Sequence, residues 1–413
     1  SGWVKKKFGN YNENFYVNVF ELILRCKGNY LWPAMWSNKF SENGKSSKIA
    51  NADLADKYGV VMGTSHHEPL CRAGVEWQEK YKKYGTSNKW DFNVNEKAIT
   101  EFWRDGVKRN MPYENVYTLG MRGEADSALG GSVADNINLL KRVITTQKNI
   151  LKENNLQDAP QVLTVYKEVE DFWHGTSEVK GLKKWNVLDD VTIMLCDDNF
   201  GNMRTLPEGE DIHRKGGWGM YYHFDYHGGP TSYEWVNTTQ LNKVWEQMSM
   251  AYEHGIDDIW IVNVGDLKPM EMNISYFLDM AYDYDSWGKN GGNKTDEYME
   301  KWVEQQFGDA LNKTQQADIQ SLLQEYTWLN GTCKPEVLSS STYHVSNYNE
   351  SQEMLGRIER MITKADEVTK IVPERLQAAY YQLVYYPAVA SANVAKMQIC
   401  SGLNKYFYDK KST

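Results

Sequence analysis

Two neighbouring apolar stretches, Val162-Leu-Thr-Val-Tyr-Lys-Glu168 and Val191-Thr-Ile-Met-Leu-Cys196, decide the fold class of this chain. Both have the length and composition of strands, and both carry acids only at the carboxyl end, with Asp197 and Asp198 directly after the second. A solvated edge strand would distribute its charges along one face. Parallel strands covered on both faces are continuously apolar, and their polar residues collect where the strand ends. The two stretches therefore predict a parallel α/β sheet with its chemistry at the carboxyl edge.

Five further apolar stretches have the same form, and helical patterns separate them. Strands are expected near residues 30, 60, 118, 163, 193, 221 and 260, and each is followed by polar residues. This is the pattern of a (β/α)8 barrel of the TIM type, in which the active site lies at the carboxyl ends of the strands. A doubly wound sheet needs no polar cluster after every strand, so it is the weaker alternative.

A closed barrel of this type has eight strands, and the sequence predicts one fewer. The chain opens on a helical pattern over residues 12–27. We therefore expect the first barrel strand to lie upstream of Ser1, so that it is lacking from this chain.

The pattern changes after residue 286. Trp287–Lys294 is rich in glycine and asparagine, as a flexible linker is. From Thr295 onward only helical periodicity is found, and Pro387 is predicted to kink a long helix over residues 375–403. We predict a barrel catalytic domain over residues 1–290 and an all-α helical domain over residues 291–413.

The composition excludes several classes of protein. A net charge of -9 argues against nucleic acid or an anionic membrane as the partner. No apolar run is long enough to span a membrane. Five scattered cysteines without a C-x-x-C pair argue against a disulfide framework or a cysteine metal site. The 15 tryptophans and 27 tyrosines suit the stacking of sugar rings, although most are expected in the core.

Acidic residues dominate the predicted strand ends. Paired carboxylates are what glycoside hydrolysis requires, because one protonates the leaving oxygen while the other activates water or attacks. A lone acid more often caps a helix or pairs with a cation. Several acids at successive strand ends favour the catalytic interpretation; they are Glu124, Asp126, Glu168, Asp197, Asp198 and Asp266.

The segment His66-His67-Glu68 is a candidate metal site. Neighbouring histidines on an extended stretch point to opposite sides, and no further histidine lies at helical spacing. We therefore expect no metal, and predict that these histidines donate to sugar hydroxyls. His223 is open to the same two interpretations.

Cations also lie at the strand ends, at Arg122, Lys167 and Lys268. A cation beside an acid lowers the pKa of that acid and can be purely structural. It can equally bind an anionic group of a substrate, arginine in bidentate fashion. The sequence leaves both roles open.

Several segments resemble glycoside hydrolase family 115, the xylan α-1,2-glucuronidases. The similarity runs from Ser1 into the helical tail, in the family's order. The segments are Asn29–Trp36, Val61–Pro69, Leu119–Gly123, Tyr166–Val169, Cys196–Asn199, Tyr222–Asp225, Ile261–Glu271 and Tyr381–Pro387.

The resemblance implies removal of α-1,2-linked glucuronic or 4-O-methylglucuronic acid side chains from glucuronoxylan or aldouronic acids, with inversion and without a metal or other cofactor. It implies a longer parent protein that is secreted or periplasmic and forms a homodimer through domains absent here. In the family, a barrel strand ending in Asn-Asp-Glu precedes the position of Ser1, in agreement with the missing strand. We therefore expect weak or no activity from this chain alone.

Matching family positions point to Glu168, Asn199, His67 and Asn263, and to an acid at the position of Glu124 or Asp126. We predict that Glu168 is the general acid, since an apolar barrel rim favours the protonated carboxyl. The base is left open between Asp126, Asp198 and an aspartate upstream of the chain. The remaining residues predicted to bind substrate are Trp32, His66, Arg122, Lys167, Asp197, His223, Tyr226 and Lys268.

Two other classes of protein remain as alternatives. A non-catalytic saccharide-binding protein of this fold would keep the aromatic residues and lose the acids, yet Asp126, Glu168 and Asp198 are present. A metal-dependent sugar isomerase or deacetylase is suggested by His66 and His67. Activity that survives chelation would exclude it.

Overall fold

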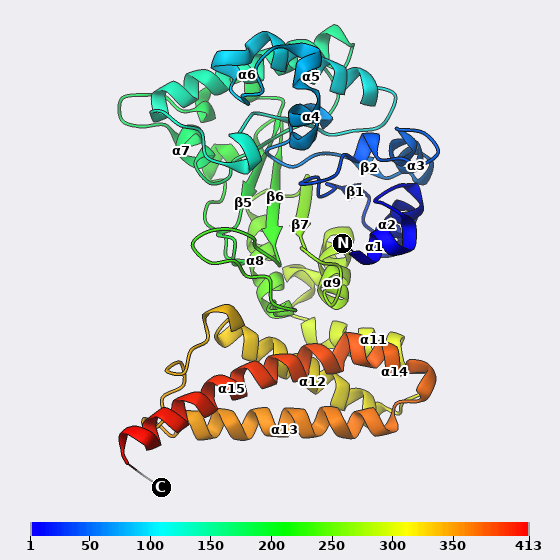
Figure 1. Cartoon of the computed structure of the whole chain (residues 1–413), viewed down its shortest axis with the longest axis vertical. Coiled ribbons are helices and arrows are strands. Elements are labelled where there is room, and N and C mark those ends of the chain that lie inside the picture. Colours follow the sequence, from blue (N-terminus) through cyan, green and yellow to red (C-terminus); the bar gives the residue numbers. More distant parts are fainter. Residues whose placement is uncertain (1, 412–413) are drawn as a thin grey trace. The chain divides into compact units, whose positions relative to one another are not determined.

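The predicted strands are present in the computed structural model, which describes residues 2–411 (Figure 1). They are β1 (Tyr30–Leu31), β2 (Val61–Met62), β3 (Tyr117–Leu119), β4 (Gln161–Thr164), β5 (Thr192–Cys196), β6 (Trp218–His223) and β7 (Ile259–Asn263). The seven expected positions are thus confirmed. Every residue of β3, β4 and β6 is buried, as their continuous apolar runs predict.

The strands follow one another in chain order. β1 pairs with β2, and β3 to β7 form a five-stranded sheet in the order β3-β4-β5-β6-β7. The pairing is parallel from β3 through β6, and a parallel bridge between Met62 and Asn115 connects β2 to the chain before β3. This is a mixed α/β fold with a parallel half-barrel sheet. Within residues 2–411 no pairing of β7 with β1 closes it, so the full (β/α)8 barrel stays a prediction.

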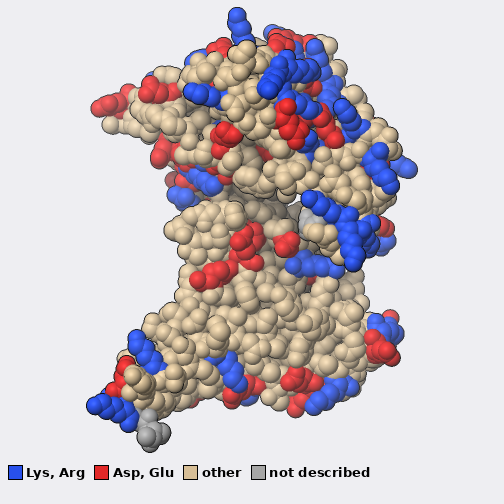
Figure 2. Space-filling model, in the orientation of Figure 1, with Lys and Arg blue, Asp and Glu red and all other residues tan. Residues whose placement is uncertain are grey.

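Helices alternate with the strands, as the periodicity predicts. They are α1 (Gly2–Phe8), α2 (Glu13–Arg25), α3 (Ala50–Tyr58), α4 (Gly74–Tyr84), α5 (Phe92–Asn110), α6 (Val133–Glu153), α7 (Val169–His174), α8 (Leu241–Glu253), α9 (Glu271–Tyr282) and α10 (Tyr284–Trp287). Around α4 and α5 basic and acidic side chains are interspersed (Figure 2). None of the helices in residues 2–411 is long and apolar enough to cross a membrane.

The helix α6 shows how a helix fixes the end of a strand. Ser132 caps its first turn by accepting a hydrogen bond from the amide of Asp135. Further along the helix, the buried Gln147 side chain accepts from the Gly120 amide and donates to the Gly120 carbonyl, both at 2.8 Å. Gly120 follows β3 directly and has a φ of 100°, a conformation that favours glycine. One side chain therefore satisfies both polar groups of the residue where β3 ends.

The chain after Thr295 is helical, and no strand follows β7 in the part of the chain that the structure describes. Its helices are α11 (Thr295–Phe307), α12 (Lys313–Thr332), α13 (Glu350–Ile371), α14 (Glu374–Tyr380) and α15 (Tyr386–Asp409). The long helices α12, α13 and α15 pack against one another (Figure 1).

The predicted kink at Pro387 takes a different form. A π-helical turn over Tyr381–Tyr385 separates α14 from α15 and ends just before the proline. Proline has no amide hydrogen, and its ring clashes with the carbonyl four residues earlier. The wider π-helical turn is one way for the backbone to accommodate this. The interruption therefore precedes the proline.

Contacts within the chain group its residues into two units. Unit 1 comprises Ser1–Cys196, Thr205–Tyr221 and Ala251–Trp260, and unit 2 comprises Asp197–Arg204, Tyr222–Met250 and Ile261–Thr413. The polar residues that follow β2, β3 and β4 belong to unit 1, and those that follow β5, β6 and β7 belong to unit 2. The domain boundary near residue 290 stays a prediction.

We predict that Gln147→Leu destabilises the protein by about 2–6 kcal/mol. The substitution leaves the buried amide and carbonyl of Gly120 without partners, and each unsatisfied group costs about 1–3 kcal/mol. Chemical denaturation measures the effect, with the exposed Gln157→Leu as the control. Equal stability of the two variants would contradict the assigned role.

Candidate active site

Six polar side chains meet beyond the carboxyl ends of β2, β3 and β4, all within unit 1. We call them the strand-end cluster: His66, His67, Arg122, Asp126, Lys167 and Glu168. The register pairs Leu119 of β3 with Leu163 of β4. Arg122 and Glu168 therefore follow adjacent strands, three residues after Leu119 and five residues after Leu163.

Arg122 lies between the two carboxylates of the strand-end cluster. Its Nε donates to Oε1 of Glu168 at 3.0 Å and its Nη2 to Oε2 at 2.6 Å. Its Nη1 donates to the carbonyl of Asp126 at 2.6 Å and contacts the carboxylate of that residue. The arginine side chain is only 3% exposed. Although burial by itself lowers the pKa of Arg122, the hydrogen bond to Glu168 and the charge of Asp126 raise it, so the guanidinium stays charged.

Asp126 has the largest number of polar partners in the cluster. Besides Arg122, it accepts from Nζ of Lys167 at 3.0 Å and from Nε2 of His66 at 2.9 Å. Burial alone raises the pKa of Asp126, but the His66 hydrogen bond and the neighbouring positive charges hold it well below the ordinary value. Asp126 is therefore ionised at any working pH.

The two histidines are neutral. Burial lowers the pKa of His66, and burial together with His66 lowers that of His67 to about 3. His66 donates from Nε2 to the ionised Asp126, while His67 shares a hydrogen bond between Nδ1 and the hydroxyl of Ser65 at 2.9 Å. Neutral imidazoles can donate to or accept from a sugar hydroxyl.

Aromatic rings border the histidines. Trp36 is 60% exposed and stacks on His67 with ring centroids 4.8 Å apart. Tyr166 and Tyr221 contact His66, at 5.0 and 6.1 Å between centroids. An exposed indole beside polar groups is the usual partner of a sugar face. The sequence prediction missed these three rings, although Trp36 and Tyr166 lie within segments that carry the family resemblance.

Some of the residues with positive φ angles follow β3, β4 and β5. Ala125 and Asp126 after β3, Lys167 after β4 and Asn199 after β5 have φ values of 51°, 60°, 53° and 71°. Non-glycine residues pay about 1–3 kcal/mol for such conformations, which persist where the surroundings enforce them. The contacts around these loops therefore stabilise backbone conformations that non-glycine residues seldom adopt.

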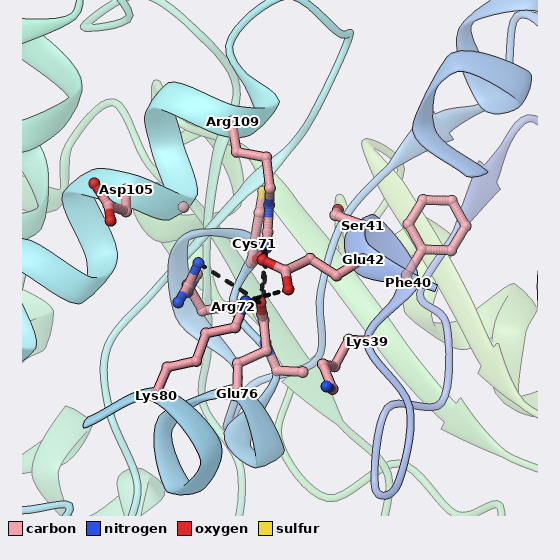
Figure 3. A network of polar contacts seen from close by, with 12 residues as sticks. Lys39, Phe40, Ser41, Glu42, Cys71, Arg72, Glu76, Lys80, Asp105 and Arg109 are labelled. Carbon is pink, nitrogen blue, oxygen red and sulfur yellow. Dashed lines mark hydrogen bonds and ion pairs between the residues drawn. The ribbon is translucent and has the colours of Figure 1, made fainter. Parts of the chain in front are cut away.

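An ion-pair network anchors the chain that follows the histidines (Figure 3). The buried Glu76 accepts from Nη1 of Arg109 at 2.7 Å and lies 3.6 Å from Nη1 of Arg72. Arg109 also donates to Glu42 at 3.0 Å and to the carbonyl of Cys71 at 2.7 Å. The φ of Cys71 is 62°, so the network holds a strained segment next to the strand-end cluster.

The surroundings of Glu168 differ from the expected apolar rim. The Arg122 guanidinium contacts both of its oxygens, so a charged partner takes the place of the expected apolar rim. The sequence shows that β4 is apolar. It does not show that Arg122, which follows the adjacent strand β3, contacts Glu168. The general-acid role of Glu168 stays a prediction.

The remaining candidates of unit 1 lie at the margin of the cluster. Glu124 is exposed and accepts a hydrogen bond from Gln78 instead of joining Arg122. Trp32 donates to the hydroxyl of Tyr30 at 2.7 Å and contacts the ring of Tyr221, which in turn contacts His66.

The geometry of the two histidines corrects one step of the sequence argument. His66 and His67 lie in a turn after β2, so they do not point to opposite sides. Both approach Asp126, and one ligand atom from each of the three residues lies within 4.8 Å of the others. A cation is nevertheless disfavoured, because Arg122 and Lys167 already place two positive charges on Asp126.

In unit 2, Asp197 organises the loop after β5. It is 1% exposed and accepts from the amides of Asn199, Gly201 and His223, each at 3.0 Å. Nδ1 of His223 donates to it at 2.6 Å. Asp197 therefore orients the His223 ring and fixes the turn that presents Asn199.

The other predicted residues of unit 2 also have defined contacts. Both oxygens of Asp198 accept hydrogen bonds within its own loop, from Phe200 and Asn202. Asn263 accepts from the Gly265 amide at 3.2 Å, and the exposed Lys268 donates to Gln382 at 2.9 Å. Tyr226 donates to the carbonyl of Gly229 at 2.9 Å. The contacts of Asp198 with Phe200 and Asn202 show that its carboxylate stabilises the loop after β5.

The chain has a parallel half-barrel sheet with two carboxylates at its strand ends, beside histidines that can hydrogen-bond to sugar hydroxyls. This combination is typical of the α/β glycoside hydrolases. The chain belongs to glycosyl hydrolase family 115, whose family model matches residues 1–337. This confirms the family resemblance seen in the sequence.

One solved structure that the chain resembles is a family GH115 4-O-methyl-α-glucuronidase described as having specificity for decorated arabinogalactans. The two share 31% sequence identity with a TM-score of 0.84, over 98% of this chain and 53% of that one. The chain therefore spans about half the length of the structure it matches. No curated protein matches it.

The buried Glu68 makes the stability of the protein depend on pH. It lies beside the strand-end cluster, with Oε1 at 3.9 Å from Nε2 of His67. Burial raises its pKa from 4.5 to about 8. The folded state then keeps a proton that the unfolded state loses, so the free energy of unfolding falls between pH 4.5 and 8, by up to about 1.4 kcal/mol per pH unit.

We predict that Glu68→Gln removes this part of the pH dependence. Urea unfolding at several pH values between 4.5 and 8 measures it as a difference from the unsubstituted protein that grows with pH. Glu21→Gln, on an exposed helix surface, is the control. The same pH slope before and after the Glu68 substitution would show that this carboxyl titrates normally.

Proposed function

We propose that the protein is an inverting glycoside hydrolase that removes α-1,2-linked glucuronic or 4-O-methylglucuronic acid side chains from glucuronoxylan. The observation that carries this is the pair of carboxylates, Asp126 and Glu168, held on one buried guanidinium at adjacent strand ends. Membership in family 115 and the glucuronidase of similar structure support the reaction class. A polysaccharide substrate is consistent with a secreted or periplasmic protein.

The unequal surroundings of the two carboxylates suggest their roles. Asp126 is held by Arg122, Lys167 and His66 and stays ionised, so we assign it the base that takes a proton from the attacking water. Glu168 has hydrogen bonds from Arg122 and is half-buried, and we assign it the acid that protonates the leaving oxygen because it matches the family position.

Inversion requires room for a water between the two carboxyls, about 6.5–9.5 Å of separation. The guanidinium of Arg122 contacts both Glu168 and Asp126, and inversion is proposed on the family resemblance. The neutral His66 and His67 and the exposed Trp36 are proposed to bind the sugar through its hydroxyls and one ring face.

Glu168→Gln in the complete protein is expected to reduce release of uronic acid from glucuronoxylan by about 10²–10⁴-fold, because the amide cannot donate the catalytic proton. Asp171→Asn, an exposed acid three residues along the chain, is the control. Free uronic acid is quantified after incubation with glucuronoxylan and with aldouronic acids. Undiminished release by the Glu168 variant would refute its assignment.

The same assay with a decorated arabinogalactan tests the polymer separately from the reaction. If uronic acid is released from arabinogalactan and not from glucuronoxylan, the proposed polysaccharide substrate is wrong, while the proposed hydrolysis of uronic acid side chains stands.

We predict that chelation with EDTA leaves the activity of the complete protein unchanged, because the charges of Arg122 and Lys167 take the place that a cation would have at Asp126. The measurement is the rate of uronic acid release before and after exhaustive dialysis against the chelator. Loss of activity that added divalent ions restore would favour a metal at His66, His67 and Asp126.

A further inference from the structure

The chain is acidic as a whole, yet its first segment is basic. The net charge of the chain is -9. Its first 48 residues contain eight lysine and arginine residues and three glutamates, which gives this segment a net charge of +5. Such a separation of charge within one protein indicates a surface for a partner of negative charge, because opposite charges attract such a partner to one place only.

Six exposed side chains of this segment make up what we call the basic surface: Trp3, Lys5, Lys6, Lys7, Lys45 and Lys48. The first four belong to α1, and the last two to the loop before α3. Within residues 2–411, none of these five lysines lies within ion-pair distance of a carboxylate. Other lysines of unit 1 do pair, since Lys83 lies 2.5 Å from Asp105 and Lys148 lies 2.7 Å from Asp190. The ammonium groups of the basic surface are therefore available to a partner outside the chain.

Hydrogen bonds bring the two lysine segments to one place. Glu13, at the start of α2, accepts from the amide of Lys45 at 2.6 Å and from that of Ser46 at 2.8 Å. The side chain of Asn12 donates to the carbonyl of Phe8, the last residue of α1, at 3.0 Å. The end of α1 and the loop before α3 therefore both adjoin the first turn of α2. Figure 2 shows Lys and Arg side chains gathered over the region where Figure 1 places α1 and α2.

An exposed aromatic ring accompanies these charges. Trp3 is 60% exposed, and Nζ of Lys7 lies 4.9 Å from its ring centre. An indole with this much exposed surface can contact the apolar part of a sugar ring. The neighbouring ammonium can form a charge-assisted hydrogen bond with a carboxylate. The basic surface therefore combines the two kinds of group that suit a polysaccharide with acidic side chains.

The basic surface is connected along the chain to the candidate active site. The segment that follows the carboxyl end of β1 carries Trp36, whose ring stacks on His67 of the strand-end cluster at 4.8 Å. The same segment continues to Lys45 and Lys48. Between these points Phe40 is only 4% exposed, so its burial anchors the segment in the core. One anchored segment thus leads from the strand-end cluster to the basic surface.

We propose that the basic surface binds the polysaccharide substrate outside the strand-end cluster, at acidic side groups other than the one being removed. This inference rests on the proposed function, because it takes the polymer from it. The surface would raise the affinity for long polymers that carry many carboxylates. Short fragments with a single carboxylate at the strand-end cluster would gain nothing from it.

A single polysaccharide chain suits the basic surface better than an anionic membrane does. A membrane would also face the acidic remainder of the protein, whereas one polymer chain can lie along the lysines alone. The lysines also come from two separate segments, while membrane-surface helices usually present their basic residues along one helix.

Charge reversal in the complete protein tests the proposal. The variant with Lys5→Glu, Lys6→Glu and Lys7→Glu together should bind immobilised glucuronoxylan about 10-fold or more weakly, as measured by biolayer interferometry. Salt at about 0.5 M should weaken binding of the unsubstituted protein in the same way, because it screens exposed charges. Glucuronoxylan with its carboxyl groups reduced to alcohols should bind both proteins equally weakly.

The matched control changes the net charge by the same amount on exposed residues of the helical segment, with Lys370→Glu, Lys405→Glu and Lys410→Glu together. It should retain the affinity for glucuronoxylan. Kinetics give a second readout. The α1 variant should raise KM for glucuronoxylan by about 10-fold at an unchanged kcat, because steering by charge acts on association. Both constants should stay the same for a short aldouronic acid.

Unchanged affinity for glucuronoxylan in a folded α1 variant, an equal loss in the control variant, or equally tight binding of the reduced polymer would overturn the proposal. So would lysine-dependent binding of phosphatidylserine vesicles or DNA without lysine-dependent binding of glucuronoxylan. Thermal unfolding establishes that each variant is folded, and Lys45→Glu with Lys48→Glu is the second test if the α1 variant is not.

The outcome is separable from that of the proposed function. Lysine-dependent binding of glucuronoxylan without release of uronic acid would leave the basic surface in place and contradict the hydrolysis. Release of uronic acid with the same KM for the polymer in the α1 variant would contradict the basic surface alone.

Discussion

The buried guanidinium of Arg122 is the constraint on which the rest of the candidate site depends. It is hydrogen-bonded to acids that follow two adjacent strands, Glu168 after β4 and Asp126 after β3. Removing one member of such a buried group leaves a charge without compensation, which costs about 3–5 kcal/mol. The arginine therefore ties the two loops together, and His66 and Lys167 take their positions from Asp126.

More distant parts of unit 1 support this arrangement through polar contacts that leave little freedom. Gln147 of α6 satisfies both backbone groups of Gly120, two residues before Arg122. Glu76 and Arg109 hold the strained segment at Cys71, a few residues after the histidines. Side chains of the helices α5 and α6 thus stabilise the segments that carry the site. Positions of this kind can keep catalytic groups within the narrow limits that catalysis needs.

The errors of the sequence-based interpretation have specific physical causes. His66 and His67 were placed on opposite sides because an extended chain was assumed, whereas a turn puts both beside Asp126. Glu168 was expected in apolar surroundings because its own strand is apolar, and the guanidinium that contacts it comes from another strand.

Local sequence was sufficient for the strands, their parallel character and the family. The apolar runs, the acids at their ends and the order of the motifs are properties of the chain itself, because burial on both faces demands continuous apolar residues. Tertiary structure was needed for the partners of each charge: which acids Arg122 contacts and which aspartate shapes a loop. These pairings join residues far apart in the chain, and a local pattern contains no information about the distance between such residues.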